Sequence, residues 1–301
     1  MKIPIIFLGT GQAIPTARRN HTSILLNYKN ENILIDCGEG TQRQFRKAKI
    51  NPCSITRILI THWHGDHVLG LPGLLQTLML NGYNKNLQIY GPRGTEKFLS
   101  LMLSLFVKVG KLNVEINEVG AGKIFENKDF SIIAGEMSHG APCLAYSFIE
   151  KDKIRIDKEK LKKYKLKGKI ISELQKGNDI LWQDKKIKAS QLTYLQKGRK
   201  ITFILDTSIN KNAEKLAENS DLLICESTFL ENSENGKQLA KEYKHLTAKQ
   251  AAEIAKKANC KKLILTHLSQ RYENKEKLIL AEARKIFKNT EIAEDLMKIE
   301  V

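Results

Sequence analysis

The chain has few cysteines, few prolines and no long hydrophobic run. Its 301 residues include five Cys and six Pro, and the cysteines are scattered along the sequence. This excludes a disulfide framework and a Cys-rich metal knuckle, so we interpret the cysteines as small buried side chains in a reducing compartment. The most apolar stretch, 69–80, is shorter than the roughly 18 residues of a membrane span. We therefore expect a cytoplasmic protein that does not enter a membrane.

Acidic residues are also scarce relative to basic ones. Lys and Arg number 50 against 33 Asp and Glu, which leaves a formal net charge of +17. Such a surplus favours a polyanionic partner, namely RNA, DNA or an anionic membrane surface. Hydrophobic residues make up 42% of the chain, enough for a sizeable core. Intrinsic disorder is therefore excluded for most of the sequence.

Short apolar runs alternate with helical patterns along both halves of the chain. The helical patterns cover 41–49, the stretch after His67 as far as Leu80, and segments that begin at Thr247 and Lys275. Strands that feed helices in both halves indicate an α/β fold in which helices cover sheets. The predicted strands are 3–8, 23–27, 32–36, 57–60, 87–90, 112–119, 130–136, 144–149, 201–205, 222–225 and 262–265.

One segment, 150–169, concentrates the positive charge. It holds ten basic and four acidic residues. A solvated charge run without a partner is one interpretation, and an arm that binds phosphates is the other. We favour the arm because so much of the surplus charge is gathered there, with a small hydrophobic seam along one side.

The sequence Thr61-His62-Trp63-His64-Gly65-Asp66-His67 follows a β-branched apolar strand. Open α/β sheets usually bind ligands at this end of a strand. Three imidazoles and a carboxylate this close together can converge on a metal if the backbone is not helical, and Gly65 permits the bend. Structural histidines are the alternative, but the pattern favours a preformed metal-binding loop.

Three further ligand-type residues stand at the ends of predicted strands. These are His139, Asp206 and His267. Any one of them alone is more often a capping or hydrogen-bonded polar residue. Together with the histidine-rich loop they predict metal ligation, because the loop by itself cannot complete two coordination shells. His21 fits no such pattern and is interpreted as a surface or packing residue.

Taken in order, these ligand-type residues resemble the signatures of the metallo-β-lactamase fold. Their surroundings resemble ribonuclease Z, the family of tRNA 3′-processing endonucleases, from Phe7 to the last strand. The matching stretches are Phe7-Leu8-Gly9-Thr10-Gly11, Ile35-Asp36-Cys37-Gly38-Glu39-Gly40-Thr41-Gln42, residues 61–67, Asp206-Thr207, Glu226-Ser227-Thr228-Phe229, His245-Leu246-Thr247-Ala248 and Leu265-Thr266-His267-Leu268-Ser269 followed by Arg271-Tyr272.

The resemblance implies a single domain, 1–301, with a four-layered αββα sandwich and a protruding basic arm at 150–169. It also implies two zinc ions per subunit. One would be held by His62, His64 and His139, and the other by Asp66, His67 and His267, with Asp206 bridging the two. Such a pair of cations lowers the pKa of a shared water and clamps the oxygens of a phosphodiester.

The resemblance further assigns two catalytic residues. Asp66 would orient the attacking water and take its proton, although ligation alone is the alternative role. His245 would give a proton to the departing ribose oxygen, with Glu226 orienting its ring.

A homodimer is also implied, in which the arm of one subunit holds the tRNA elbow while its partner cuts. The sequence departs from the family pattern in two places. The family usually has a Gly-Pro pair in the arm, but no Pro follows Gly168. At Ala17 the family has Lys, and the neighbouring Arg18 is the available substitute. The predicted RNA-binding residues are Arg18, Arg19, Lys160, Lys162, Lys163, Lys165 and Lys167.

The resulting hypothesis is a zinc-dependent endoribonuclease. It would remove the 3′ trailer from precursor tRNA and leave a 3′-hydroxyl on the tRNA and a 5′-phosphate on the trailer. Two alternatives stay open, a small-molecule phosphodiesterase or arylsulfatase of the same fold and a noncatalytic RNA-binding protein. The ligand set also accepts Mn or Fe.

Overall fold

The structure is a computed structural model that describes residues 2–107, 110–164, 166, 168–183 and 185–301. The chain divides into two compact units. The larger unit comprises 1–125, 132–148 and 200–301, and the smaller unit comprises 126–131 and 149–199. The predicted arm, 150–169, lies within the smaller unit.

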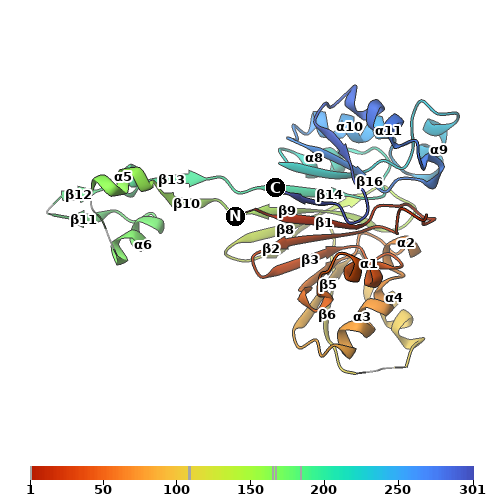
Figure 1. The fold of residues 1–301 in the computed structure, drawn as a ribbon, viewed down its shortest axis with the longest axis horizontal. Coiled ribbons are helices and arrows are strands. Elements are labelled where there is room, and N and C mark those ends of the chain that lie inside the picture. The colour runs from red at the N-terminus through yellow and green to blue at the C-terminus, as the bar shows by residue number, and fades with distance from the viewer. Residues whose placement is uncertain (1, 108–109, 165, 167, 184) are drawn as a thin grey trace. The chain divides into compact units, whose positions relative to one another are not determined.

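Two seven-stranded sheets form the centre of the larger unit (Figure 1). In the first sheet β18, β1, β2 and β3 are antiparallel neighbours, and β3 to β6 are parallel. Its order is β18 (Lys298–Glu300), β1 (Pro4–Gly9), β2 (Ser23–Tyr28), β3 (Glu31–Ile35), β4 (Arg57–Leu59), β5 (Asn86–Gly91) and β6 (Asn113–Glu118).

The second sheet contains three strands from the middle of the chain and four from its C-terminal half. Its strands β14 to β17 are parallel, so their carboxyl ends meet at one edge. The order is β17 (Thr290–Ile292), β16 (Leu263–Thr266), β15 (Leu222–Glu226), β14 (Lys200–Ile204), β9 (Cys143–Glu150), β8 (Phe130–Met137) and β7 (Gly122–Glu126).

Helices cover the outer faces of both sheets, which confirms the predicted αββα sandwich (Figure 1). The Tyr146 hydroxyl on β9 donates to Ile60 O at 2.7 Å and so links the two sheets across the buried interior. The helices beside the first sheet are α1 (Thr41–Lys47), α2 (Gly65–Val68), α3 (Leu71–Leu80) and α4 (Thr95–Ser104), and those beside the second are α8 (Lys211–Ala217), α9 (Gly236–Tyr243), α10 (Ala248–Lys257) and α11 (Glu276–Arg284).

Local sequence explains where two of these helices begin and end. Thr247 caps α10 by accepting from Gln250 N, and the Gln250 side chain accepts from Thr247 N, which is a capping box. The single helical stretch predicted up to Leu80 is instead divided into α2 and α3. At Gly70, an added Cβ would lie 2.1 Å from Gly38 O, so this close backbone approach interrupts the helix.

The smaller unit has a hydrophobic core of its own. Leu174, Ile180 and Leu192 are buried in it. At its base Glu150 N donates to Arg199 O at 2.8 Å, so the two ends of the unit meet. The unit extends beyond the predicted arm, to Arg199. The prediction stopped at residue 169 because it followed the run of basic residues, which is densest before that position. Its elements are β10 (Lys153–Ile156), α5 (Lys158–Lys163), α6 (Lys169–Gln175), β11 (Ile180–Trp182), β12 (Lys185–Ile187), α7 (Ala189–Leu192) and β13 (Thr193–Gln196).

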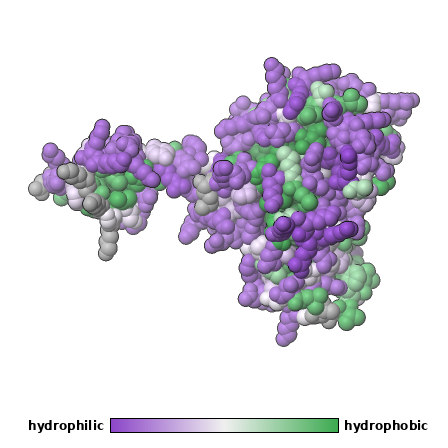
Figure 2. Space-filling model, in the orientation of Figure 1, coloured by the Kyte–Doolittle hydropathy of each residue, from purple (hydrophilic) through white to green (hydrophobic). Residues whose placement is uncertain are grey.

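The face of the larger unit seen in Figure 2 is mostly hydrophilic, with a hydrophobic area over α3 and α4. Leu80 at the end of α3, Leu101 on α4, and Leu105, Phe106 and Val107 after α4 are exposed. Within the described residues, the helices are too short or too polar to cross a membrane.

Candidate metal centre

The histidine-rich loop follows β4 and directs its side chains to two places. The backbone of His62 and His64 is nonhelical, as predicted, and that of His64 is extended. Asp66 and His67 lie in α2, so the prediction of a nonhelical backbone is wrong for these two residues. The helical turn that begins at Gly65 directs them away from His62 and His64, and a single loop can thus serve two groups of ligands.

Left-handed backbone at three strand ends places further side chains at the same edge. Asp36 and His267 directly follow β3 and β16, and Asp206 lies two residues after the end of β14; their φ angles are 55°, 56° and 44°. A residue other than Gly in this conformation costs on the order of 1 kcal/mol or more, and such residues cluster at functional sites. Each turns the chain sharply as the strand ends.

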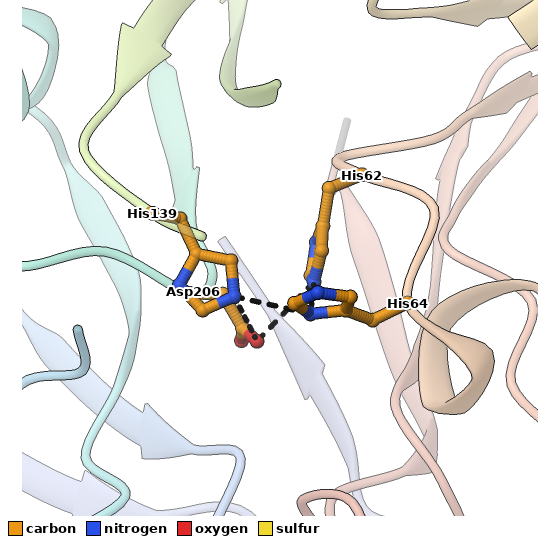
Figure 3. Close-up of side chains that lie close together, drawn as sticks. All are labelled: His62, His64, His139 and Asp206. Atoms are coloured by element: carbon orange, nitrogen blue, oxygen red, sulfur yellow. Dashed lines mark hydrogen bonds and ion pairs between the residues drawn. The ribbon is translucent and has the colours of Figure 1, made fainter. Parts of the chain in front are cut away.

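The first ligand group comprises His62, His64, His139 and Asp206 (Figure 3). His62 and His64 approach from one segment, and His139 and Asp206 approach from two others. His64 Nδ1 lies 3.0 Å from His62 Nε2 and 3.2 Å from His139 Nε2. Asp206 Oδ2 lies 3.4 Å from His62 Nε2 and 3.6 Å from His139 Nε2.

The second ligand group comprises Asp66, His67, Asp206 and His267. His67 Nε2 lies 3.2 Å from His267 Nε2, and Asp66 Oδ2 lies 3.4 Å from both nitrogens. Asp206 Oδ2 is 3.4 Å from His67 Nε2, and Asp206 Oδ1 is 3.0 Å from His267 Nε2. Asp206 therefore belongs to both groups, and its Oδ2 faces both.

These spacings fit metal coordination. With metal–ligand bonds of about 2.0–2.1 Å in a tetrahedral arrangement, neighbouring ligand atoms lie about 3.3 Å apart. Apart from its close approach to His267 Nε2, the buried Asp206 Oδ1 has no hydrogen-bond partner among the residues that the structure describes, although buried carboxylate oxygens are normally hydrogen-bonded. A cation in each group would satisfy both observations.

Local charge also favours cations. Burial lowers the pKa of His67, but the carboxylates of Asp206, Asp66 and Asp36 outweigh it and raise that pKa well above its usual value. The pocket therefore attracts positive charge. At His62, burial and the neighbouring imidazoles hold the pKa well below its usual value, so this ring is neutral, the form that binds a metal.

Hydrogen bonds around the ligands fix which ring nitrogen is available. Asp36 Oδ2 accepts from His67 Nδ1 at 2.7 Å, and Lys244 O accepts from His139 Nδ1 at 3.0 Å. The Thr61 hydroxyl donates to Asp36 and therefore accepts from His62 Nδ1 at 3.1 Å. The Thr228 hydroxyl donates to Glu226 and accepts from His267 Nδ1 at 3.0 Å. In these four histidines Nε2 is thus the nitrogen whose lone pair is available to a metal ion.

Sequence reasoning missed the role of Asp36. The residue is fully buried, binds Thr61 N and Oγ1 at 2.7 and 2.8 Å, and orients His67. The signal was present, because Asp36, like Asp206, is a carboxylate at the end of an apolar strand. Its partner was not visible, because 31 residues separate Asp36 from His67 in the sequence.

His245 lies at the edge of the two groups. Its Nδ1 is 3.1 Å from Glu226 Oε2 and 4.0 Å from Asp206 Oδ2. Burial lowers the pKa of His245, but Glu226 and then Asp206 raise it, to about 9. Glu226 also accepts from Thr207 N and Thr228 Oγ1, both at 2.6 Å, which fixes its carboxylate. The arrangement can hold a protonated imidazole beside the ligands.

The predicted RNA-binding residues lie in different environments. Arg18 is exposed and its Nη1 donates to Asn274 Oδ1 at 2.8 Å. Arg19 is buried, and its Nη1 donates to Thr10 Oγ1 and Ala293 O at 2.7 and 2.8 Å. Its guanidinium is therefore occupied within the fold. On α5 of the smaller unit, Lys160, Lys162 and Lys163 are exposed. Lys165 and Lys167 lie outside the described residues.

The sandwich and its two ligand groups define the class of metallo-β-lactamase-fold proteins. The fold matches the metallo-β-lactamase fold protein YhfI from Bacillus subtilis, with a TM-score of 0.70 at 19% identity over 100% of this chain and 99% of that one. It also matches the short form of human tRNase Z, with a TM-score of 0.72 at 28% identity over 98% of both chains. A family model described as anti-Pycsar protein Apyc1 matches residues 3–110.

Sequence relatives identify the particular family. The chain is 41% identical to Ribonuclease Z of Methanothermobacter thermautotrophicus, over 99% of this chain and 96% of the relative. It is also 41% identical to Ribonuclease Z of Listeria welshimeri, over 99% of both chains. The chain belongs to the ribonuclease Z family, which confirms the predicted family.

Proposed function

We propose that this protein is an endoribonuclease that removes the 3′ trailer from precursor tRNA by hydrolysis of a phosphodiester. The tRNA would keep a 3′-hydroxyl and the trailer a 5′-phosphate. The observation that carries this proposal is the pair of ligand groups that share Asp206, in a chain of the ribonuclease Z family. A noncatalytic RNA-binding protein would have no use for such a centre.

We assign two zinc ions per subunit to this centre. His62, His64 and His139 would hold one and Asp66, His67 and His267 the other, with Asp206 between them. When bound, the two cations supply a shared water of lowered pKa and positive charge for the phosphate oxygens. The histidine-rich ligand set and the spacing of the ligand atoms support zinc.

The chain's own residues move the protons. Asp66 Oδ2 faces the second ligand group and would orient the attacking water and accept its proton. His245, held by Glu226, would donate a proton to the departing ribose oxygen. The raised pKa of His245 supports this role, because the ring carries its proton at neutral pH.

Incubation of the purified protein with a tRNA transcript extended at its 3′ end tests the proposal. We expect one cut at the 3′ side of the acceptor stem, with a 3′-hydroxyl on the tRNA. A chelator should abolish the cut and zinc should restore it, which metal analysis of the same samples checks. Turnover of a chromogenic diester without any cut in the transcript would favour the small-molecule phosphodiesterase instead.

The proposed role of His245 predicts a specific pH dependence of the cleavage rate. Because the pKa of His245 in the folded protein is raised, the proton is present below that pKa and lost above it. Bound cations would oppose part of this rise. We expect cleavage to fall as the pH rises toward about 9. His245→Gln should lower kcat by about 10²- to 10⁴-fold and remove this alkaline limb.

Glu226→Gln is the matched variant for this measurement. It removes the charge that raises the pKa of His245, so the alkaline limb should move to lower pH. An alkaline limb unchanged in both variants would assign the proton to another group. The readout is the pH profile of single-turnover cleavage.

We further propose that the smaller unit is the arm that binds tRNA. Its segment 149–199 holds sixteen Lys and Arg against seven Asp and Glu. The exposed Lys160, Lys162 and Lys163 on α5, together with Lys165 and Lys167, are the proposed phosphate contacts, and Arg18 is a proposed contact in the larger unit. We leave Arg19 out of this set because its guanidinium is engaged within the fold.

We also propose a homodimer in the cytoplasm, in which the arm of one subunit serves the metal centre of its partner. The exposed hydrophobic side chains on α3 and α4 support association with a second copy (Figure 2). The five cysteines are free, which fits a reducing compartment.

A further inference from the structure

His21 is a buried histidine beside the metal centre, and neither ligand group includes it. It is 6% exposed and lies just before β2. It packs against Gly38, where an added Cβ would lie 2.4 Å from both His21 Cβ and Asp66 O. Gly38 thus packs closely between His21 and the backbone of Asp66.

Local packing alone does not explain why position 21 is a histidine. Its Nε2 lies 3.0 Å from Ala13 O, and because a carbonyl only accepts, Nε2 carries the hydrogen. Its Nδ1 is buried with no hydrogen-bond partner within the described part of the chain. An apolar side chain of similar size would avoid that unsatisfied nitrogen, whose burial is unfavourable. The bond to Ala13 is what requires the imidazole.

Ala13 links this bond to Asp66. Its backbone N–H donates to Asp66 Oδ2 at 3.0 Å, the oxygen that faces His67 and His267. Its φ is 21°, an unfavourable value for a residue with a Cβ. Ala13 is exposed, so core packing does not hold it in this conformation. The hydrogen bonds at its carbonyl and its amide do.

We propose that His21 is a positioning residue for Asp66. By holding Ala13 O, it keeps Ala13 in the left-handed conformation whose N–H binds Asp66 Oδ2. Without that bond, Ala13 relaxes to an ordinary φ and its N–H leaves the carboxylate, which is then free to rotate away from the second ligand group. The effect on RNA cleavage rests on the proposed function, whereas the effect on metal binding does not.

His21→Met and His21→Gln in the full-length protein test this proposal. The two new side chains have the same length, but only Gln keeps a donor near the position of Nε2. We expect His21→Met to weaken one of two zinc-binding steps by about 10-fold, the lower end of the effect of residues that orient metal ligands. The step it weakens should be the one lost in Asp66→Ala. His21→Gln should keep affinity close to wild type.

Ala13→Gly separates positioning from packing. Glycine adopts positive φ without the Cβ penalty, so it needs less help from His21. In the double variant, we therefore expect Ala13→Gly to restore most of the zinc affinity that is lost in His21→Met alone. Zinc affinity is measured by competition with a chelator, and kcat and KM on precursor tRNA are measured in parallel, with a loss in kcat at unchanged KM expected for His21→Met.

Three outcomes would overturn the proposal. These are wild-type affinity for both zinc ions in His21→Met, no rescue by Ala13→Gly, and a His21→Met variant that is unfolded by circular dichroism. If the wild-type protein leaves precursor tRNA uncut, the proposed function fails, while the zinc measurements still decide the role of His21.

Discussion

Replacing Asp66 by Ala is expected to lower cleavage of precursor tRNA by about 10⁴-fold, the upper end for one positioned proton acceptor. The loss should be this large because Asp66 Oδ2 also lies within 3.4 Å of His67 Nε2 and His267 Nε2. One substitution thus removes a proposed metal ligand together with the proposed base. Single-turnover cleavage at saturating protein measures the effect.

Binding of tRNA by Asp66→Ala should be unchanged within about twofold, because phosphate contacts dominate affinity and Asp66 makes none. A matched control is Glu242→Ala, which removes an exposed carboxylate from α9. It should cleave at the wild-type rate. Trailer removal at a normal rate by Asp66→Ala would contradict the mechanism.

Removal of the smaller unit is expected to raise KM for precursor tRNA by about 10- to 100-fold, since several phosphate contacts are lost. The structure suggests how to close the chain. Because Glu150 N donates to Arg199 O, joining Lys151 directly to Gly198 leaves a two-residue turn between paired residues. The core of the smaller unit is removed as a whole, and the residues of both ligand groups all lie in the larger unit.

Hydrolysis of a small chromogenic diester should be spared by this deletion. A triple variant with Lys160, Lys162 and Lys163 changed to Gln keeps the unit folded and is the matched control. For it we expect a smaller rise in KM and a flatter salt dependence, by about 0.7 to 0.9 in log–log slope for each lost contact. Equal loss on both substrates would contradict this division of labour.

The proposed dimer is tested by mixing the deletion variant, which has a raised KM for precursor tRNA, with the inactive Asp66→Ala protein. The deletion variant keeps its metal centre, and Asp66→Ala keeps its arm. If arm and centre act across subunits, the mixture should regain cleavage of precursor tRNA at low substrate concentration. Activity no higher than the sum of the separate proteins would place arm and centre in the same chain.

The two groups of candidate ligands could be predicted from the sequence because their members are ligand-type side chains at recognisable places. His62, His64 and His67 are crowded in one short stretch, and Asp206 and His267 lie within two residues of the ends of strongly apolar strands. Arg19 shows the limit of such reasoning. Because Arg19 is a basic residue beside the proposed phosphate contact Arg18, the sequence predicts a second contact there. The burial of Arg19 against Ala293 depends on residues far along the chain.

The sequence alone determined the alternation of strands and helices, the family and the seven proposed ligands, because these depend on residue type and local spacing. Tertiary structure alone decided which side chains meet. It paired Asp36 with His67, placed Asp66 and His67 in α2, and placed Ala13 between His21 and Asp66. Such contacts depend on left-handed strand ends and close backbone approaches between distant segments, and neither leaves a local pattern in the sequence.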